Sequence, residues 1–208
     1  AMREAASALP AADAFTALQR ALLVEACDAD IVLDLHADNE ALLHLYVAAK
    51  RWPDAQDLAA ELDARAVLLT DDSGGGPFDE ACSRPWAALA EAFPDAAIPN
   101  ACLSATVELR SNNEVSWDDA DRDARALLRF FMRRGVVEGS AGGLPRLLCR
   151  AHSIRAMQQV RSPTEGLIVY RRRLGDTVDA GEIIAQIVPR DGGAPVEVPA
   201  TTRGVLFA

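Results

Sequence analysis

The first two-thirds of the chain alternates short apolar runs with longer segments in which apolar residues recur every three or four positions. Residues 10–26 have this helical spacing, and residues 117–134 have it again. Two further helices are expected over residues 53–62 and 78–93. Runs rich in branched apolar residues predict buried strands over residues 31–35, 66–70 and 102–109. Strands that alternate with helices predict a layered α/β domain, which we place at residues 1–143.

The helix expected over residues 117–134 carries the strongest end signals. Ser116 is suited to cap its first turn, and Asp118 and Asp119 follow where negative charge is favoured. Arg134 and Gly135 end it, as cations and glycine commonly end helices. This segment therefore closes the α/β domain before a glycine-rich stretch at residues 139–143.

Residues 144–208, which we call the β module, show short apolar runs separated by turn residues. We predict a small all-β barrel or sandwich. Residues 175–182 (Gly-Asp-Thr-Val-Asp-Ala-Gly-Glu) resemble the hairpin of biotinyl/lipoyl-like barrels. Such carriers attach their prosthetic group to a lysine, and Lys50 is the only lysine of the chain. The β module therefore resembles these barrels in structure without the carrier function.

Composition and charge narrow the class of protein. The chain has 208 residues and a net charge of −10, which argues against a general nucleic-acid binder. Its four cysteines form no CxxC pair, and no secretory signal is evident, so we expect reduced thiols and a cytoplasmic protein. No apolar run approaches the length of about 18 residues that a membrane span requires.

Candidate chemistry begins at the end of the first strand. Asp34 and His36 follow the apolar run at residues 31–33, and alternation places both side chains on one face. The carboxyl ends of strands are where open α/β sheets bind ligands. His36 is a metal ligand, a base or a core histidine on this evidence. His44 and His152 form no H-x-x-x-H or H-x-x-E pair and are interpreted as structural.

A second carboxylate lies near the end of the third strand. Glu108 follows Thr106 and Val107 in an otherwise apolar run. A buried carboxylate is costly unless it is paired or functional. Glu108 is therefore a general acid/base, a residue of a solvated edge, or one half of an internal ion pair with Arg110, which alternation places on the same face.

These features together resemble the succinylglutamate desuccinylase/aspartoacylase family of zinc carboxypeptidase-like hydrolases. The resemblance rests on the Asp34-Leu35-His36 strand, the Thr106-Val107-Glu108-Leu109 strand, the helix over residues 118–134 and the glycine-rich β module. It implies a carboxypeptidase-like layered α/β domain followed by a β module. It also implies hydrolysis of an N-acyl amino acid or a related amide or ester.

The resemblance further implies roles for three residues. His36 corresponds to the third zinc ligand of such enzymes, and Glu108 to the general base that activates a zinc-bound water. Asp34 becomes the candidate partner that orients the His36 imidazole. The implied cofactor is zinc, and the implied partner is a small N-acyl amino acid. The residues that bind this substrate are not identified.

The chain departs from the family pattern at its start. The family takes its first two zinc ligands from an H-x-x-E motif, and none of the three histidines here has glutamate three residues on. We therefore expect an N-terminally truncated member of the family that is incomplete or inactive as this chain. We expect weak or absent zinc binding, and self-association through an exposed sheet edge. The alternative is a non-catalytic binding or structural module derived from the family.

Overall fold

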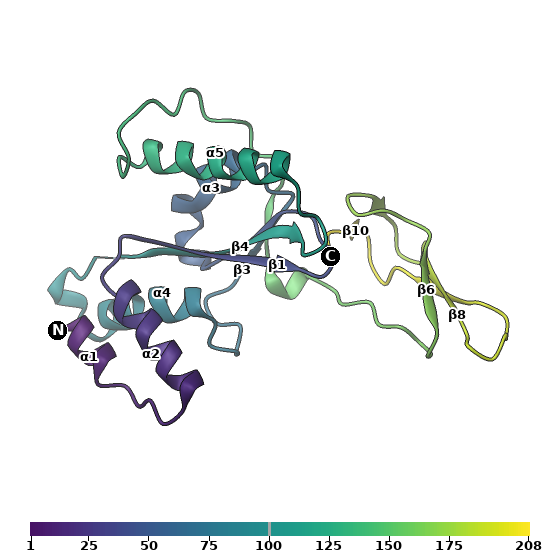
Figure 1. Ribbon diagram of the computed structural model, residues 1–208, viewed down its shortest axis with the longest axis horizontal. Helices are drawn as coiled ribbons and strands as arrows, with labels where there is room; N and C mark the ends of the chain where they lie inside the picture. Colours follow the sequence, from purple (N-terminus) through teal and green to yellow (C-terminus); the bar gives the residue numbers. More distant parts are fainter. Residues whose placement is uncertain (100) are drawn as a thin grey trace.

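A five-stranded mixed sheet forms the centre of the larger part of the molecule (Figure 1). The computed structural model describes residues 1–99 and 101–208. In spatial order the strands are β1 (Ile31–Asp38), β4 (Leu103–Ser111), β2 (His44–Val47), β3 (Ala66–Leu69) and β5 (Ala151–Ser153). β1 runs parallel to β4, whereas β2 runs antiparallel to β4 and parallel to β3. The antiparallel pair β4–β2 therefore places the end of β4 beside the start of β2.

Helices cover both faces of this sheet (Figure 1). α3 (Trp52–Glu61) and α5 (Trp117–Arg133) lie on one face, and α2 (Ala14–Ala26) and α4 (Phe78–Ala92) lie on the other. The remaining helical turns are α1 (Met2–Ser7), η1 (Ala49–Arg51), η2 (Pro94–Ala96) and η3 (Ile154–Ala156). None of the described helices has both the length and the apolar character needed to cross a membrane.

The two faces of the sheet differ in chemistry. On the α3/α5 face the strands contribute apolar side chains such as Leu45 and Val107, which pack with Phe130 in one buried cluster. On the α2/α4 face the same strands contribute polar side chains instead, among them the buried Ser104 and Thr106. Alternation along the strands produces this separation. The candidate site residues therefore share the α2/α4 face.

Helix starts follow their capping residues. α5 begins as predicted, because the Ser116 hydroxyl accepts a hydrogen bond from the Asp119 N–H. α2 begins at Ala14, four residues after the predicted start at Pro10. Asp13 and Thr16 form a reciprocal capping box there. Side-chain hydrogen bonding, rather than the proline, sets this boundary.

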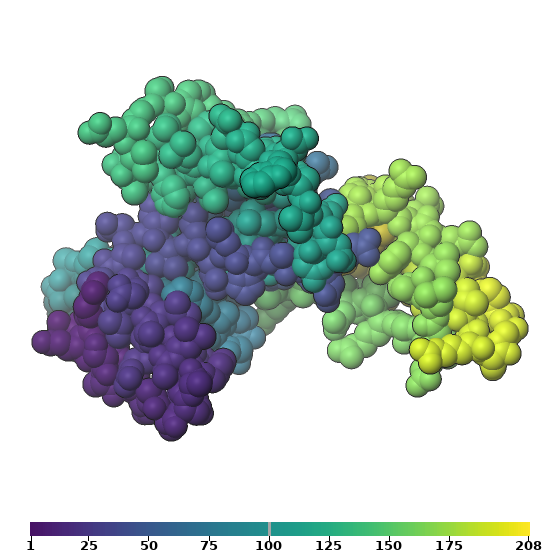
Figure 2. Space-filling view, in the orientation of Figure 1, coloured from purple at the N-terminus to yellow at the C-terminus, as the bar shows by residue number. Residues whose placement is uncertain are grey.

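The β module contains two small sheets. β6 (Leu167–Tyr170), β8 (Ile183–Val188) and β9 (Val196–Pro199) form an antiparallel three-stranded sheet, and β7 (Thr177–Val178) pairs with β10 (Gly204–Val205). The described residues form no closed barrel, so that part of the fold prediction is not confirmed. β7 and β10 are two residues long, which leaves too little ladder to join the two sheets. Figure 2 shows the segment from β6 to β10 as a separate lobe.

Two connections join the β module to the α/β domain. β5, at residues 151–153, lies after the predicted boundary at residue 143 and yet pairs with β3 in the five-stranded sheet. At the other end, the Leu42 N–H donates to the Phe207 carbonyl at 2.7 Å, and the Gly175 N–H donates to the Leu206 carbonyl. The C-terminal segment, residues 204–208, therefore contacts both the β module and the loop before β2.

β1 forms one edge of the sheet and carries apolar side chains that face solvent. Leu35 is 52% exposed, and Phe15, Leu18 and Leu22 of α2 are 67%, 58% and 47% exposed. An unpaired edge next to apolar surface favours association between chains. Self-association of this protein remains a prediction.

Candidate active site at the end of strand β4

Asp34 and His36 come together at the end of β1. Nε2 of His36 lies 3.0 Å from Oδ2 of Asp34, and the two side chains are 50% and 25% exposed. A carboxylate at Nε2 favours the tautomer that carries its hydrogen there, which leaves the lone pair of Nδ1 available. His36 is thus an accessible imidazole whose free nitrogen faces away from Asp34.

Glu108 lies beside His36 on the neighbouring strand. The two residues are partners in the β1–β4 register, and Oε1 of Glu108 is 3.8 Å from Nδ1 of His36. Burial raises the pKa of the Glu108 carboxyl; His44 and His36 act in the opposite direction, and Asp38 and Asp34 raise it further. A carboxylate with a raised pKa that is still partly accessible suits a group that takes up and releases protons.

Arg110 does not pair with Glu108, so the interpretation of an internal Glu108–Arg110 pair is wrong. The backbone of Arg110 is left-handed, with φ of +81°, and the β1–β4 register shifts at the same point. Its guanidinium instead donates to both oxygens of Asp123 on α5, at 2.8 Å and 2.6 Å. A β-bulge therefore removes the expected counter-charge from the Glu108 face.

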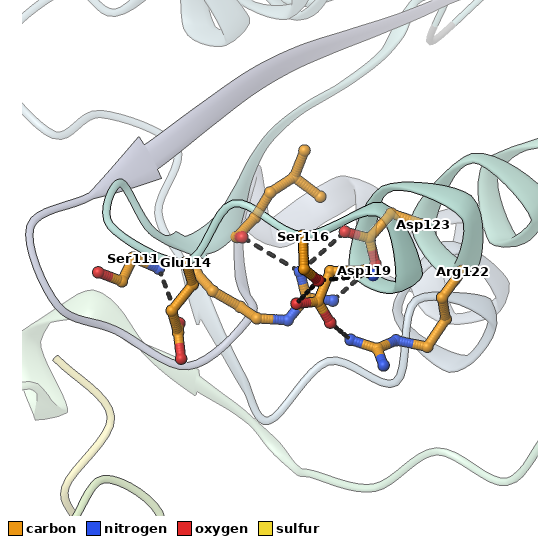
Figure 3. Close-up of polar contacts among 8 residues, drawn as sticks. Ser111, Glu114, Ser116, Asp119, Arg122 and Asp123 are labelled. Carbon is orange, nitrogen blue, oxygen red and sulfur yellow. Dashed lines mark hydrogen bonds and ion pairs between the residues drawn. The ribbon is translucent and has the colours of Figure 1, made fainter.

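The loops that follow β1 and β4 are bonded to each other. The Ser111 hydroxyl donates to the Asn39 carbonyl at 2.7 Å, and the Asn112 N–H donates to the Asp38 carbonyl at 2.7 Å. The Ser111 N–H also donates to Glu114, in the turn that leads to Ser116 and Asp119 at the start of α5 (Figure 3). These bonds hold the ends of β1 and β4 at a fixed spacing.

His44 also lies in this site, although its sequence environment indicated a structural role. It is the β2 partner of Glu108, so His36, Glu108 and His44 occupy one row across three strands. His44 has no exposed surface, and its Nε2 has no hydrogen-bond partner among the described residues. Alternation places His44 and Tyr46 on one face of β2. The sequence did not reveal that His44 pairs with Glu108, because this pairing depends on the strand order, and no sequence motif encodes that order.

His152 lies away from this row. It is an exposed residue of β5, at the opposite edge of the sheet from β1, and it pairs with Leu68 of β3. The structure thus separates the two histidines that sequence treated alike. His44 belongs to the candidate site, and His152 does not.

The thiols near the α2/α4 face are poor nucleophiles. Cys82 and Cys102 are buried, and burial raises the pKa of the Cys82 thiol to about 12 and that of Cys102 to about 11. Because the thiolate is the reactive form, these cysteines are inert at neutral pH. The four cysteines are free thiols in the structure.

The described residues do not complete a metal site. No group of three or more histidine, cysteine, aspartate or glutamate side chains in this part of the chain is arranged to hold a metal ion. A catalytic zinc takes about three protein ligands. His36 can offer Nδ1, with Glu108 nearby, and this set does not fit zinc by itself.

Comparison with solved structures finds close matches in fold. A protein assigned to the succinylglutamate desuccinylase/aspartoacylase family from Shewanella amazonensis superposes with a TM-score of 0.84 at 25% identity, over 99% of this chain and 57% of that one. A second, from Shewanella frigidimarina, gives a TM-score of 0.76 at 25% identity, over 99% and 56%. The ectoine utilization protein EutE (DoeB) from Ruegeria pomeroyi matches in fold, with a TM-score of 0.68 at 21% identity, over 97% and 62%.

These matches cover nearly all of this chain and a smaller share of the other proteins. The chain spans less than two-thirds of the length of the solved structures it resembles. No protein-family model matches the sequence, and no curated protein matches it. The relationship is therefore seen in structure, and the matching solved structures include proteins of the family that the strand motifs resemble.

Proposed function

We propose that this chain, whose fold matches solved proteins of the succinylglutamate desuccinylase/aspartoacylase family, is the Glu108-bearing part of a deacylase. The substrate class is an N-acyl amino acid or a related amide or ester. The family fold supports the reaction type. The single observation that carries the proposal is the position of Glu108, at the end of β4 beside the Asp34–His36 pair.

Glu108 has the properties that amide hydrolysis asks of a general base. Its Oε1 points toward the accessible His36, and its raised pKa brings proton uptake nearer to neutral pH. In the proposed reaction Glu108 removes a proton from the attacking water and returns it to the leaving nitrogen. General acid–base catalysis of this kind contributes about 10²–10⁴-fold to a rate.

Zinc is the cofactor expected for this family, and we propose His36 as one ligand and Asp34 as the carboxylate that orients it. Asp34 contacts Nε2 of His36, which leaves Nδ1 available to bind the metal. Further ligands would have to come from outside the described residues, because these contain no complete ligand group. No step of the proposed reaction is therefore assigned to a metal.

The same incomplete ligand group favours a second candidate function. A family-derived module that binds an acyl amino acid, or another protein, without hydrolysing it would need no metal. The free thiols support action in the cytoplasm under either proposal, because reducing compartments keep cysteines unpaired.

Hydrolysis of a panel of N-acyl amino acids, with and without added zinc, separates the two candidates. With the complete zinc ligand group present, we expect released amino acid from the unmodified protein and a loss of about 10²-fold or more with Glu108→Gln. Glu114→Gln is the matched control, because Glu114 is a carboxylate in the adjacent turn that contacts the Ser111 N–H rather than His36.

The outcomes are distinct. Equal loss in both variants, or none in Glu108→Gln, would contradict the assignment of the base. Binding of a panel member without amino acid release, detected by titration calorimetry, would support the non-catalytic module instead.

A further inference from the structure

His44 is the least expected member of the row formed by His36, Glu108 and His44. Its imidazole is fully buried and contacts the rings of Tyr46 and Phe207 edge-on, at centroid distances of 5.4 Å and 5.1 Å. Phe207 is itself held by the hydrogen bond from the Leu42 N–H to its carbonyl. The contacts with Tyr46 and Phe207 therefore fix the orientation of the His44 imidazole.

One nitrogen of His44 has a defined role. Nδ1 lies 2.8 Å from the Leu42 carbonyl oxygen. A carbonyl only accepts, so Nδ1 must carry a hydrogen. In the neutral ring Nε2 then has a bare lone pair, and it is buried with no partner among the described residues.

A matching atom lies on the neighbouring strand. Oε2 of Glu108 is also buried and also has no hydrogen-bond partner in the described part of the chain. His44 and Glu108 are direct partners in the β2–β4 register, and partners in register project to the same face. Buried polar atoms without partners are rare, because each loses its hydrogen bonds to water and gains none in return. Two such atoms on adjacent residues call for a common explanation.

We propose that His44 is the positioning residue for Glu108. One water that donates to both atoms links Nε2 of His44 to Oε2 of Glu108, because each of the two offers only a lone pair and they make no direct hydrogen bond. This link holds the far oxygen of the carboxylate, so that Oε1 stays directed toward His36. His44 touches neither substrate nor metal in this role, and its link to catalysis rests on the proposed function.

The geometry explains why a histidine is suited to this position. The Leu42 carbonyl and the two aromatic rings fix one edge of the imidazole, and Nε2 is the nitrogen on the opposite edge. Asparagine at residue 44 can reproduce the Nδ1 contact but not Nε2. Glutamine can reproduce Nε2 but not Nδ1. The two substitutions therefore separate packing from positioning.

Nuclear magnetic resonance of the side-chain nitrogens tests this link in the full chain, without any substrate. The chain has three histidines, so substitution of each in turn assigns every imidazole signal. We expect the Nε2 resonance of His44 to shift in Glu108→Gln and to stay unchanged in Glu114→Gln. The His152 resonances should not move in either variant. An unchanged His44 Nε2 resonance in Glu108→Gln would overturn the proposal.

The carboxyl carbon resonance of Glu108 provides the second readout. At fixed pH we expect it to keep its position in His44→Gln and to shift in His44→Asn. Equal shifts in both variants would show that His44 only fills space, and would overturn the positioning role. If His44→Asn does not fold, the His44 signal in Glu108→Gln decides alone. Absence of hydrolysis would contradict the proposed function and leave this link standing.

Discussion

The two neighbours of strand β4 offer Glu108 opposite environments. On the β1 side, His36 is half-exposed at the edge of the sheet and lies against Asp34. On the β2 side, His44 is completely buried beneath Tyr46 and Phe207. One carboxylate thus lies between an imidazole open to ligands and an imidazole closed to them. Position in the sheet, rather than residue type, decides what each histidine can do.

This difference extends to the apolar residues next to the two histidines. Leu35 on β1 is 52% exposed, whereas Leu45 on β2 has no exposed surface. The β2 side is the stable support of the site, and the β1 side is its accessible surface. Mutations on the two sides should therefore change different properties of the protein.

The largest expected effect is a loss of stability on the β2 side. Leu45→Ala removes a fully buried side chain from the main cluster and should lower the free energy of unfolding by about 2–5 kcal/mol. Leu35→Ala, the matched change on β1, should cost less than about 1 kcal/mol. Urea denaturation measures both. Similar losses at the two positions would contradict the distinction between the sides.

The next largest loss of stability is expected at the Arg110–Asp123 ion pair, which lies away from the Glu108 face. Arg110 and Asp123 are 16% and 11% exposed, so Arg110→Ala leaves a largely buried carboxylate without its partner. We expect a loss of about 3 kcal/mol in the same denaturation measurement. Arg125→Ala removes a solvent-exposed pair with Asp121 on the same helix and should cause no measurable change. Equal effects would show that the bulge at Arg110 has no structural role.

A smaller effect is expected in the pH dependence of stability, at the buried Asp79 of α4, a helix that packs against β1. Burial, with Glu80 and Asp34, raises the pKa of Asp79, so its folded form binds a proton more readily than its unfolded form. Its contribution to stability is present below the unfolded pKa of about 3.9 and is lost as pH rises through the folded value. Asp79→Asn should therefore be more stable than the unmodified chain at pH values above about 4.

Asp13 provides a control of opposite sign. Hydrogen bonds from the Thr16 N–H and hydroxyl lower the pKa of Asp13, so its contribution is present above about pH 3.9 and is lost as pH falls through the folded value. Asp13→Asn should therefore change the acid limb of the stability profile and leave the Asp79 window intact. The same trend in both variants would contradict this account of Asp79.

Sequence predicted the parts of the fold that local pattern determines. Three features were recognised from the sequence alone: the strand over residues 31–35, the capped helix at Ser116 and the family resemblance of the Glu108 strand. The pairing of strands that are far apart in the sequence was not recognised. β2 has four residues, which give too little alternation to assign a strand from the sequence.

The candidate site shows the same limit. Asp34 and His36 are two residues apart, so strand geometry alone places them together. His44 reaches Glu108 only because β4 lies between β1 and β2 in the sheet. Arg110 leaves that face because of a positive φ at a non-glycine residue, which residue type does not indicate. The strand order places His44 in the row with His36 and Glu108. The bulge removes Arg110, the expected counter-charge, from that face.

Zinc titration, followed by the nuclear magnetic resonance signals of the three histidine side chains, tests the contrast between the accessible His36 and the buried His44 most directly. We expect the His36 resonances to move with weak affinity while those of His44 do not, and we expect His36→Ala to abolish the response. Tight stoichiometric binding that survives His36→Ala, or an equal response at His44, would contradict the claim that Glu108 lies between one accessible and one inaccessible imidazole.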